Sequence, residues 1–207
     1  MSKERERRTS RTELRVAASG DGGKLMGCAV SYNCLSGPIP GSRAGKFRER
    51  IMPGAFSASL KRGDTVFCLM NHDPSRVMGS TRNATLRLRE TDSGLYFECD
   101  LPDTTDAQDL RKLVQRGDID SCSFGFEDVE DTWGIGEDED GDRCAIRSVV
   151  SAKLFDVSAV AMPAYTSGTS VSARSRATDY AITRLSDAEE KEIWRRAFAL
   201  QLRREGF

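Results

Sequence analysis

Hydrophobic and polar residues alternate in short runs through the middle of the chain, from about residue 24 to 166. Each run has the length and two-residue period of a β-strand. Turn-forming residues separate two of the runs at Thr91–Gly94, so we expect a β-hairpin over residues 84–100. The predicted strands are residues 24–36, 65–71, 84–90, 95–101, 119–129, 143–150 and 154–162.

Two segments show helical spacing of their apolar residues instead. Residues 53–61 predict a short helix that Gly63 ends, and residues 103–116 predict a longer one that begins with capping residues and ends at Gly117. Many strands and few helices indicate a mainly β fold with peripheral α-helices, arranged as a closed or nearly closed β-barrel.

Composition changes along the chain predict four regions. Residues 1–22 are charged and end in small residues, as in a flexible N-terminal arm, and residues 23–166 form the folded domain. Residues 167–185 are rich in Ser, Thr, Ala and Arg, a linker composition. Residues 186–207 begin with a capping pattern and carry an apolar stripe, which predicts a C-terminal amphipathic helix.

Charge and hydropathy exclude some partners. The 207 residues are 38% hydrophobic and 30% charged, with a net charge of −1. Such a balance gives no field that would attract nucleic acid. No apolar run approaches the roughly 20 residues that cross a bilayer, and no apolar signal segment follows the charged N-terminus. We therefore expect neither nucleic acid nor membrane as a partner, and action in the cytosol where the chain is made.

The cysteines and the single histidine bear on metal binding and redox state. No C-x-x-C pair occurs, and His72 has no second histidine to join it, so neither a zinc site nor a cofactor is expected. The acidic run at residues 137–142 lacks the spacing of a calcium loop and predicts a solvated hairpin tip. Buried reduced thiols are the expected state of most cysteines. The six are Cys28, Cys34, Cys68, Cys99, Cys122 and Cys144.

Three positions could carry chemistry. His72 follows an apolar strand and precedes the turn-forming Asp73–Pro74, where an imidazole could act as a base, or simply bond to the backbone. Alternation places Ser123 and Cys122 on opposite faces of one strand. The residues alone allow either one as a nucleophile, or a small residue lining a tight interior.

The third position is Asp156, which with Ser158 interrupts an apolar strand. A carboxylate is costly to bury without a partner, and orienting an imidazole would supply that partner. The alternative is the solvated face of an edge strand.

Eight short blocks, taken in order, resemble the prohead protease family of tailed bacteriophages, over roughly residues 12 to 170. Each block is weak alone, and it is their order that carries the resemblance. They are residues 47–56, 71–73 with 77–79, 85–88, 94–98, 101–104, 116–119, 123–126, and 156–158 with 163–165.

The resemblance implies a serine endopeptidase with a fold similar to that of the herpesvirus assemblins, a β-barrel surrounded by helices. It gives His72 the role of base, Ser123 that of nucleophile and Asp156 that of third member. The family often has methionine before the nucleophile, where this chain has Cys122. A thiol on the opposite strand face would only fill space, which favours serine as the nucleophile.

The family's substrates are the scaffolding segment of the phage major capsid protein and the protease itself, inside the procapsid assembling in the bacterial host cytoplasm. The segment after Tyr165 is then an expected self-cleavage region, and the terminal helix an expected docking element. A homodimer is suggested by analogy with the herpesvirus enzymes. The competing interpretation is a non-catalytic capsid-assembly or scaffold-binding protein with the same fold.

Overall fold

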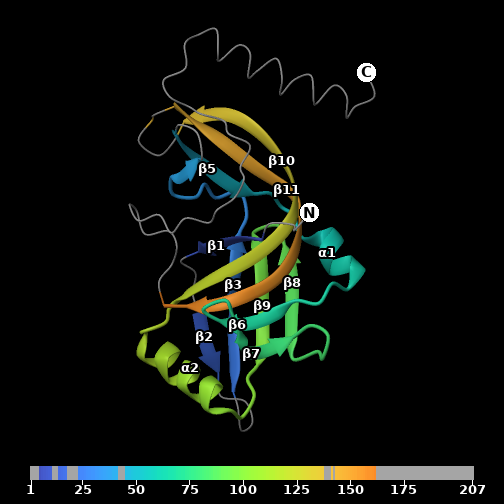
Figure 1. Ribbon diagram of the computed structural model, residues 1–207, viewed down its shortest axis with the longest axis vertical. Coiled ribbons are helices and arrows are strands. Elements are labelled where there is room, and N and C mark those ends of the chain that lie inside the picture. Colours follow the sequence, from blue (N-terminus) through green and yellow to red (C-terminus); the bar gives the residue numbers. More distant parts are fainter. Residues whose placement is uncertain are drawn as a thin grey trace.

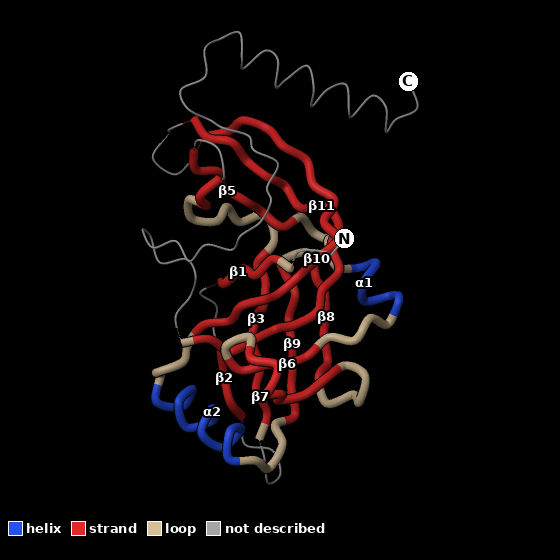
Figure 2. Tube along the Cα trace, viewed as in Figure 1, coloured by secondary structure: helices blue, strands red, loops and turns tan. Residues whose placement is uncertain are grey.

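The computed structural model describes residues 5–10, 14–17, 23–41, 45–137, 141 and 143–161. Within them the chain forms two β-sheets and two short helices, which confirms a mainly β fold with peripheral helices (Figures 1 and 2). The elements are β1 (Glu6–Ser10), β2 (Leu14–Ala17), β3 (Lys24–Ser31), β4 (Ile39–Gly41), β5 (Gly45–Ile51), α1 (Ser57–Arg62), β6 (Phe67–Met70), β7 (Asp73–Ser80), β8 (Leu86–Thr91), β9 (Gly94–Asp100), α2 (Thr105–Arg116), β10 (Ser121–Glu137) and β11 (Arg143–Val160).

The large sheet is built around the long antiparallel pair β10 and β11, which runs from the top of the described structure down to about the level of β6 (Figure 1). β1 pairs with β10, and β5 and β6 both pair in parallel with β11, at different places along it. Between those two places, residues at and just before α1 accept hydrogen bonds from the backbone of β11. The carbonyl of Ala55 accepts from the Ala152 N–H at 2.9 Å, and the Ser59 hydroxyl accepts from Leu154 N–H at 3.2 Å. The strand paired with β11 thus changes from β5 to β6 along its length, and the N–H groups of Ala152 and Leu154 between the two still have hydrogen-bond partners.

The small sheet is antiparallel, in the order β2-β3-β9-β8. In the described residues both sheets have free ends, so the predicted closed barrel is not observed. Register shifts near Gly125 and Glu127 interrupt the β10–β11 ladder. Such bulges bend a strand pair, and the two sheets then pack face to face with a shared core instead of joining edge to edge.

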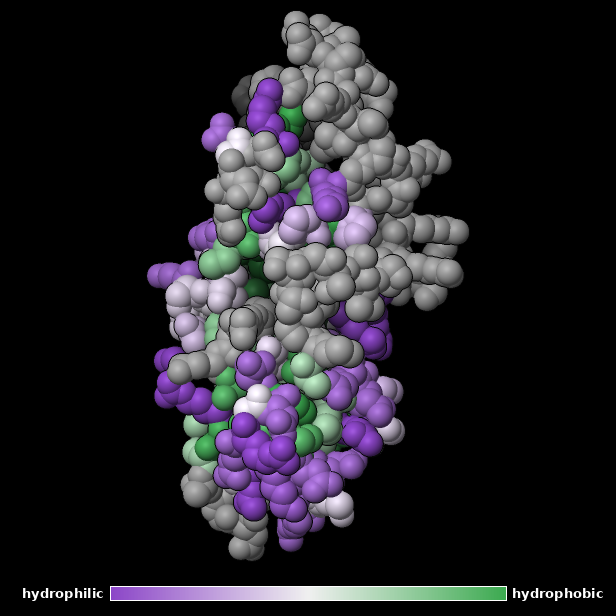
Figure 3. Space-filling model, turned by 90° about the vertical axis from the view of Figure 1, so that its left-hand side faces the viewer, coloured by the Kyte–Doolittle hydropathy of each residue, from purple (hydrophilic) through white to green (hydrophobic). Residues whose placement is uncertain are grey.

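The core between the sheets contains both aromatic and aliphatic side chains. Phe56, Phe124 and Phe126 form a cluster with ring centroids 5.4 to 6.3 Å apart. The small sheet contributes buried side chains such as Leu25 and Leu95. Hydrophilic side chains cover the lower part of the face seen in Figure 3, with hydrophobic ones visible only between them.

Several local predictions are confirmed. The 84–100 hairpin is present as β8 and β9. The longer helix is α2, with the Thr104 side chain accepting from Ala107 N–H at its start and Gly117 left-handed at its end. The shorter one, α1, begins at Ser57 instead of Pro53, because residues 53–56 form a turn.

Other predictions are corrected. Residues 6–10 and 14–17, expected in a flexible arm, form β1 and β2. Residues 143–150 and 154–162, expected as two strands, belong to one strand that ends at Val160, because the neighbouring elements supply partners along its whole length. The linker and terminal helix predicted for 167–185 and 186–207 lie outside the described residues, and the division into domains stays a prediction.

Candidate active site

Strand alternation decides which side chains share a face of the large sheet where the start of β10 pairs with the end of β11. Ser123 pairs with Ser158, and Gly125 with Asp156, so these positions share one face of the large sheet. Cys122 lies on the opposite face, fully buried among the core side chains. The thiol that the sequence left as an alternative nucleophile therefore points away from the serine face.

His72 stands in a two-residue hairpin turn between β6 and β7. Both turn residues are left-handed, with φ of 53° at Asn71 and 58° at His72, and Met70 pairs with Asp73 across them. Two such residues in succession are the mark of a type I′ turn, a conformation that is uncommon for residues other than glycine and in which asparagine and histidine occur more often than most. The sequence had placed the turn at Asp73–Pro74; those residues begin β7 instead.

Asn71 fixes this turn to the end of β11. Its backbone N–H donates to the carbonyl of Ala159 at 2.9 Å, and its side-chain oxygen accepts from the N–H of Ala161 at 3.2 Å. A histidine held in an uncommon backbone conformation by its neighbours is a frequent feature of functional sites.

The turn brings His72 into contact with both other predicted site residues. Its Nε2 lies 2.5 Å from the Ser123 Oγ, and its Nδ1 lies 2.6 Å from an Asp156 carboxylate oxygen. Ser158, for which the sequence gave no role, donates its hydroxyl to the same carboxylate oxygen at 2.8 Å. Three residues from separate strands or turns thus form one continuous chain of hydrogen bonds, the arrangement of a Ser-His-Asp triad.

The Asp156 carboxylate is buried in a space that exists because Gly125 opposite it has no side chain. Its side chain is 2% exposed, and its second oxygen, Oδ2, has no hydrogen-bond partner. Opposite it, a Cβ on Gly125 would lie 2.5 Å from that oxygen and 2.5 Å from the Phe155 ring. Phe155 is the extra residue of a β-bulge, since Gly125 pairs with Asp156 and Phe126 with Leu154. Only glycine at position 125 leaves space for this carboxylate beside the bulge.

β1 covers the serine. It pairs antiparallel with β10, with Arg8 opposite Phe124 and Thr9 opposite Ser123. The Ser123 hydroxyl donates to the carbonyl oxygen of Arg8 at 2.9 Å, and Ser123 is only 1% exposed. A hydroxyl has a single proton, so the Arg8 carbonyl and His72 compete for it.

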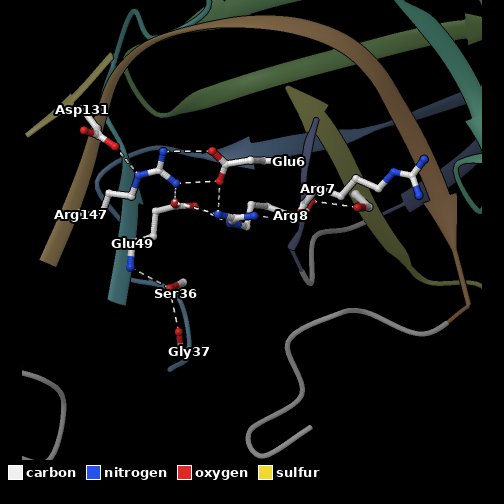
Figure 4. A network of polar contacts seen from close by, with 9 residues as sticks. Glu6, Arg7, Arg8, Ser36, Gly37, Glu49, Asp131 and Arg147 are labelled. Atoms are coloured by element: carbon white, nitrogen blue, oxygen red, sulfur yellow. Dashed lines mark hydrogen bonds and ion pairs between the residues drawn. The ribbon is translucent and has the colours of Figure 1, made fainter. Parts of the chain in front are cut away.

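β1 is held by a buried charge cluster of Glu6, Arg8, Glu49 and Arg147 (Figure 4). Arg8 Nε lies 2.6 Å from Glu49, and Arg147 Nη1 lies 2.7 Å from Glu6 and 2.9 Å from Glu49. Arg147 Nε also donates to Asp131 at 2.6 Å. The four side chains come from β1, β5 and β11, so they fix the first of these strands against the other two.

The pKa shifts follow from this arrangement. Burial alone would raise the pKa of Glu6, but Arg147 and Arg8 outweigh it and hold that pKa below its ordinary value. Burial acts on Arg147 in the opposite sense, and the carboxylates of Glu6 and Glu49 still raise its pKa above the ordinary value. Both groups stay charged at neutral pH in spite of their burial.

None of the six cysteines, all of which lie in the described residues, forms a disulfide, and Cys68, Cys99 and Cys122 are buried as expected, whereas Cys34 is exposed. A hydrogen bond with Cys99, together with burial, holds the pKa of the Cys68 thiol well above its ordinary value. Among the described residues, no three His, Cys, Asp or Glu side chains gather as metal ligands. No helix in the described part of the chain is long and apolar enough to cross a membrane.

The sequence reasoning missed β1, Asn71 and Ser158. A signal for β1 existed: Glu6 and Arg8 alternate with Arg7, as residues on one strand face do, but charged residues near a chain end are more typical of solvent exposure. Ser158 was noticed as a polar interruption, and only the fold shows which carboxylate it serves.

Comparisons with known proteins bear on the family and the fold of the chain. A family model described as caudovirus prohead serine protease matches residues 11–181. Among solved structures, the bacteriophage T4 capsid assembly protease, gp21, is similar with a TM-score of 0.51 over 79% of this chain and 100% of that chain. The two share 12% sequence identity, so the likeness concerns the fold. No curated protein sequence matches the chain.

Proposed function

Because the chain belongs to the caudovirus prohead serine protease family, we propose that it is a serine endopeptidase that cleaves the scaffolding segment of its phage's capsid protein during procapsid maturation. The observation that carries this proposal is the hydrogen-bonded chain from Ser123 through His72 to Asp156, with contacts of 2.5 and 2.6 Å. The T4 relative is named as a capsid assembly protease, which supports the choice of substrate.

The mechanism is acyl transfer. The Nδ1–H of His72 donates to Asp156, which leaves Nε2 to take the Ser123 proton as Oγ attacks a peptide carbonyl carbon. His72 then gives that proton to the departing amine, and an ester links the acyl group to Ser123. Water, deprotonated by the same Nε2, hydrolyses the ester and restores the serine. Asp156 and Ser158 hold the imidazole in one orientation and stabilise its cationic form.

The site of action and the further partners follow from this role. The enzyme works inside the procapsid assembling in the host cytoplasm, and it also cleaves its own chain in the Ser/Arg-rich segment after Tyr165. That segment lies outside the described residues. Mass spectrometry of purified virions tests self-cleavage, and an intact segment 166–207 in mature particles would contradict it.

The experiment that tests the activity is co-expression with the cognate capsid protein. Wild type is compared with Ser123→Ala, His72→Ala and the core control Cys122→Ala, with products measured by mass spectrometry. We expect cleavage at the scaffold boundary by wild type and Cys122→Ala only. Cleavage by Ser123→Ala would contradict the nucleophile, and no cleavage by wild type would favour the non-catalytic assembly protein.

A further inference from the structure

β1 lies along the edge of β10 that carries Ser123. It is an end strand of the large sheet, paired only with β10 among the described strands. Proteins that bind extended peptides often add them to a sheet edge in this way, with backbone hydrogen bonds for affinity and alternate side chains for specificity. Removing β1 would leave the edge of β10 free over residues 122–126, directly beside the nucleophile.

The backbone of β1 also presents a peptide group to Ser123. The Arg8 carbonyl oxygen lies 2.9 Å from the Ser123 Oγ. It accepts the hydroxyl proton through oxygen and is not positioned by this contact for attack at carbon. In a substrate bound on the same register, the residue in the place of Arg8 would supply the acyl group.

Side chains of that strand meet two charged positions. The Arg8 guanidinium bonds to Glu49 and lies 5.4 Å from the centre of the Phe126 ring, a place suited to a flat cation. Two residues earlier, the Glu6 carboxylate receives two hydrogen bonds from Arg147, at 2.7 and 3.0 Å. Arg7, between them, is exposed. The strip along β10 that β1 fills, with Glu49 and Arg147 beside it, is called the groove below, and it contacts every second side chain of the strand.

An uncharged occupant would leave this groove poorly satisfied. Glu49 is 3% exposed and Arg147 is 8% exposed with β1 in place. A strand without an acid and a base would bury them with fewer hydrogen bonds, which is costly for charged groups. A strand with the two charges exchanged would place a carboxylate beside Glu49 and a cation beside Arg147. This like-charge repulsion would weaken binding more than an uncharged strand does.

We propose that the groove along β10 binds the substrate strand in the place of β1, and that Arg147 and Glu49 select an acidic residue two positions before a basic residue at which the chain is cut. This rests on the proposed function and names its substrate class: an extended peptide with an acid-x-base pattern. β1 must leave before such a peptide binds, so the free chain is held inactive by its own strand.

The test uses full-length protein with Ser123→Ala, so that binding is measured without cleavage. Glu6→Ala and Arg8→Ala are added to loosen β1, and Arg7→Ala at the exposed neighbouring position is the matched control. The probes are fluorescein-labelled peptides with the sequence of residues 4–12, and variants with Ala at the acid, at the base, at both, or with the two exchanged. Fluorescence anisotropy gives the affinities.

We expect the acid-x-base peptide to bind about tenfold to a hundredfold more tightly than each single-Ala peptide, as the loss of a charged hydrogen bond implies. Binding should be tighter to the Glu6→Ala/Arg8→Ala protein than to the Arg7→Ala protein. Glu49→Gln should weaken the preference for the base, whose remaining ion-pair partner is the acid of the same strand, and keep the preference for the acid, which separates recognition from misfolding. Equal affinities for all peptides would overturn the proposal.

The two proposals fail separately. If the peptides show the preference but wild type never cleaves capsid protein, the groove stands and the endopeptidase assignment falls. If wild type cleaves capsid protein but the peptides bind without preference, the endopeptidase stands and the groove assignment falls. Active enzyme with Glu6→Ala/Arg8→Ala should also cut the acid-x-base peptide after the base, and a cut elsewhere would overturn the register.

Discussion

Gly125 makes the sharpest prediction about the site, because its replacement acts on the Asp156 carboxylate without removing any catalytic group. In Gly125→Ala the new Cβ would lie 2.5 Å from Asp156 Oδ2. Ordinary contact begins at 3.4 Å, so the carboxylate would have to retreat by about 0.9 Å. That carboxylate is fixed at its other oxygen by His72 and Ser158, at 2.6 and 2.8 Å. The retreat would pull it away from the imidazole.

Two magnitudes separate the effect on activity from the effect on folding. Overpacking of this kind costs about 1–3 kcal/mol of unfolding free energy, against the roughly 5–15 kcal/mol that stabilises a typical domain, so the variant should stay folded. A misplacement of about 1 Å in a catalytic constellation lowers the rate about a hundredfold. We therefore expect the melting temperature to fall by about 2–12 °C with the protein still folded at room temperature, and the activity to fall about a hundredfold.

The assay combines thermal unfolding with the rate of capsid-protein cleavage. Gly134→Ala is the matched control, because Gly134 lies on the same strand and a Cβ there meets nothing within 4 Å. It should leave both quantities near those of wild type. If Gly125→Ala is folded and cleaves as fast as Gly134→Ala, then the Asp156 carboxylate does not need its present position and the triad geometry is not what drives the reaction.

Three other changes give further expectations. Asn71→Ala places alanine, which tolerates the left-handed region less well than asparagine, at φ near 53° and loses the bond to Ala161, which should cost about 1–2 kcal/mol and slow cleavage. Asn71→Gly, which loses the same bond, should be more stable than Asn71→Ala, and a melting temperature equal in both variants would argue against backbone strain. Ser158→Ala removes one charged hydrogen bond to Asp156 and should lower kcat/KM about tenfold to a hundredfold, while an unchanged value would mean that this bond does not orient the carboxylate. Because the folded-state pKa of Glu6 is lowered, its stabilising effect is complete above the ordinary value of 4.5 and is lost as pH falls through the folded-state pKa. The difference in unfolding free energy between wild type and Glu6→Gln should thus be constant at neutral pH and shrink below pH 4.5, and a difference that grew on acidification would contradict the sign.

The sequence predicted those parts of the structure that depend on local rules. Alternation alone placed Ser123 and Cys122 on opposite faces, and Gly117 marked the end of α2. The predicted triad residues do lie together, although the choice of Ser123 over Cys122 came from family resemblance and not from the residues themselves. Their catalytic roles stay a proposal.

What the sequence could not predict depends on distant partners. β1 is a strand because Glu49 and Arg147, far along the chain, offset the burial of its charges. The length of β11 was missed because Ser151 and Lys153 resemble an interruption until the α1 segment is seen to supply its hydrogen bonds. The closed barrel was an extrapolation from strand count, and strand count does not say whether the end strands meet.

The separation of β1 from β10 along the chain has a consequence for the order of events during synthesis. Arg8 and Ser123 are 115 positions apart, and the histidine turn is made before both Ser123 and Asp156. Pairing over such distances is late and slow in folding. On the ribosome, β1 is therefore synthesised before Ser123 and Asp156 emerge. A newly made enzyme thus already contains the strand that covers Ser123 when the last triad residue emerges.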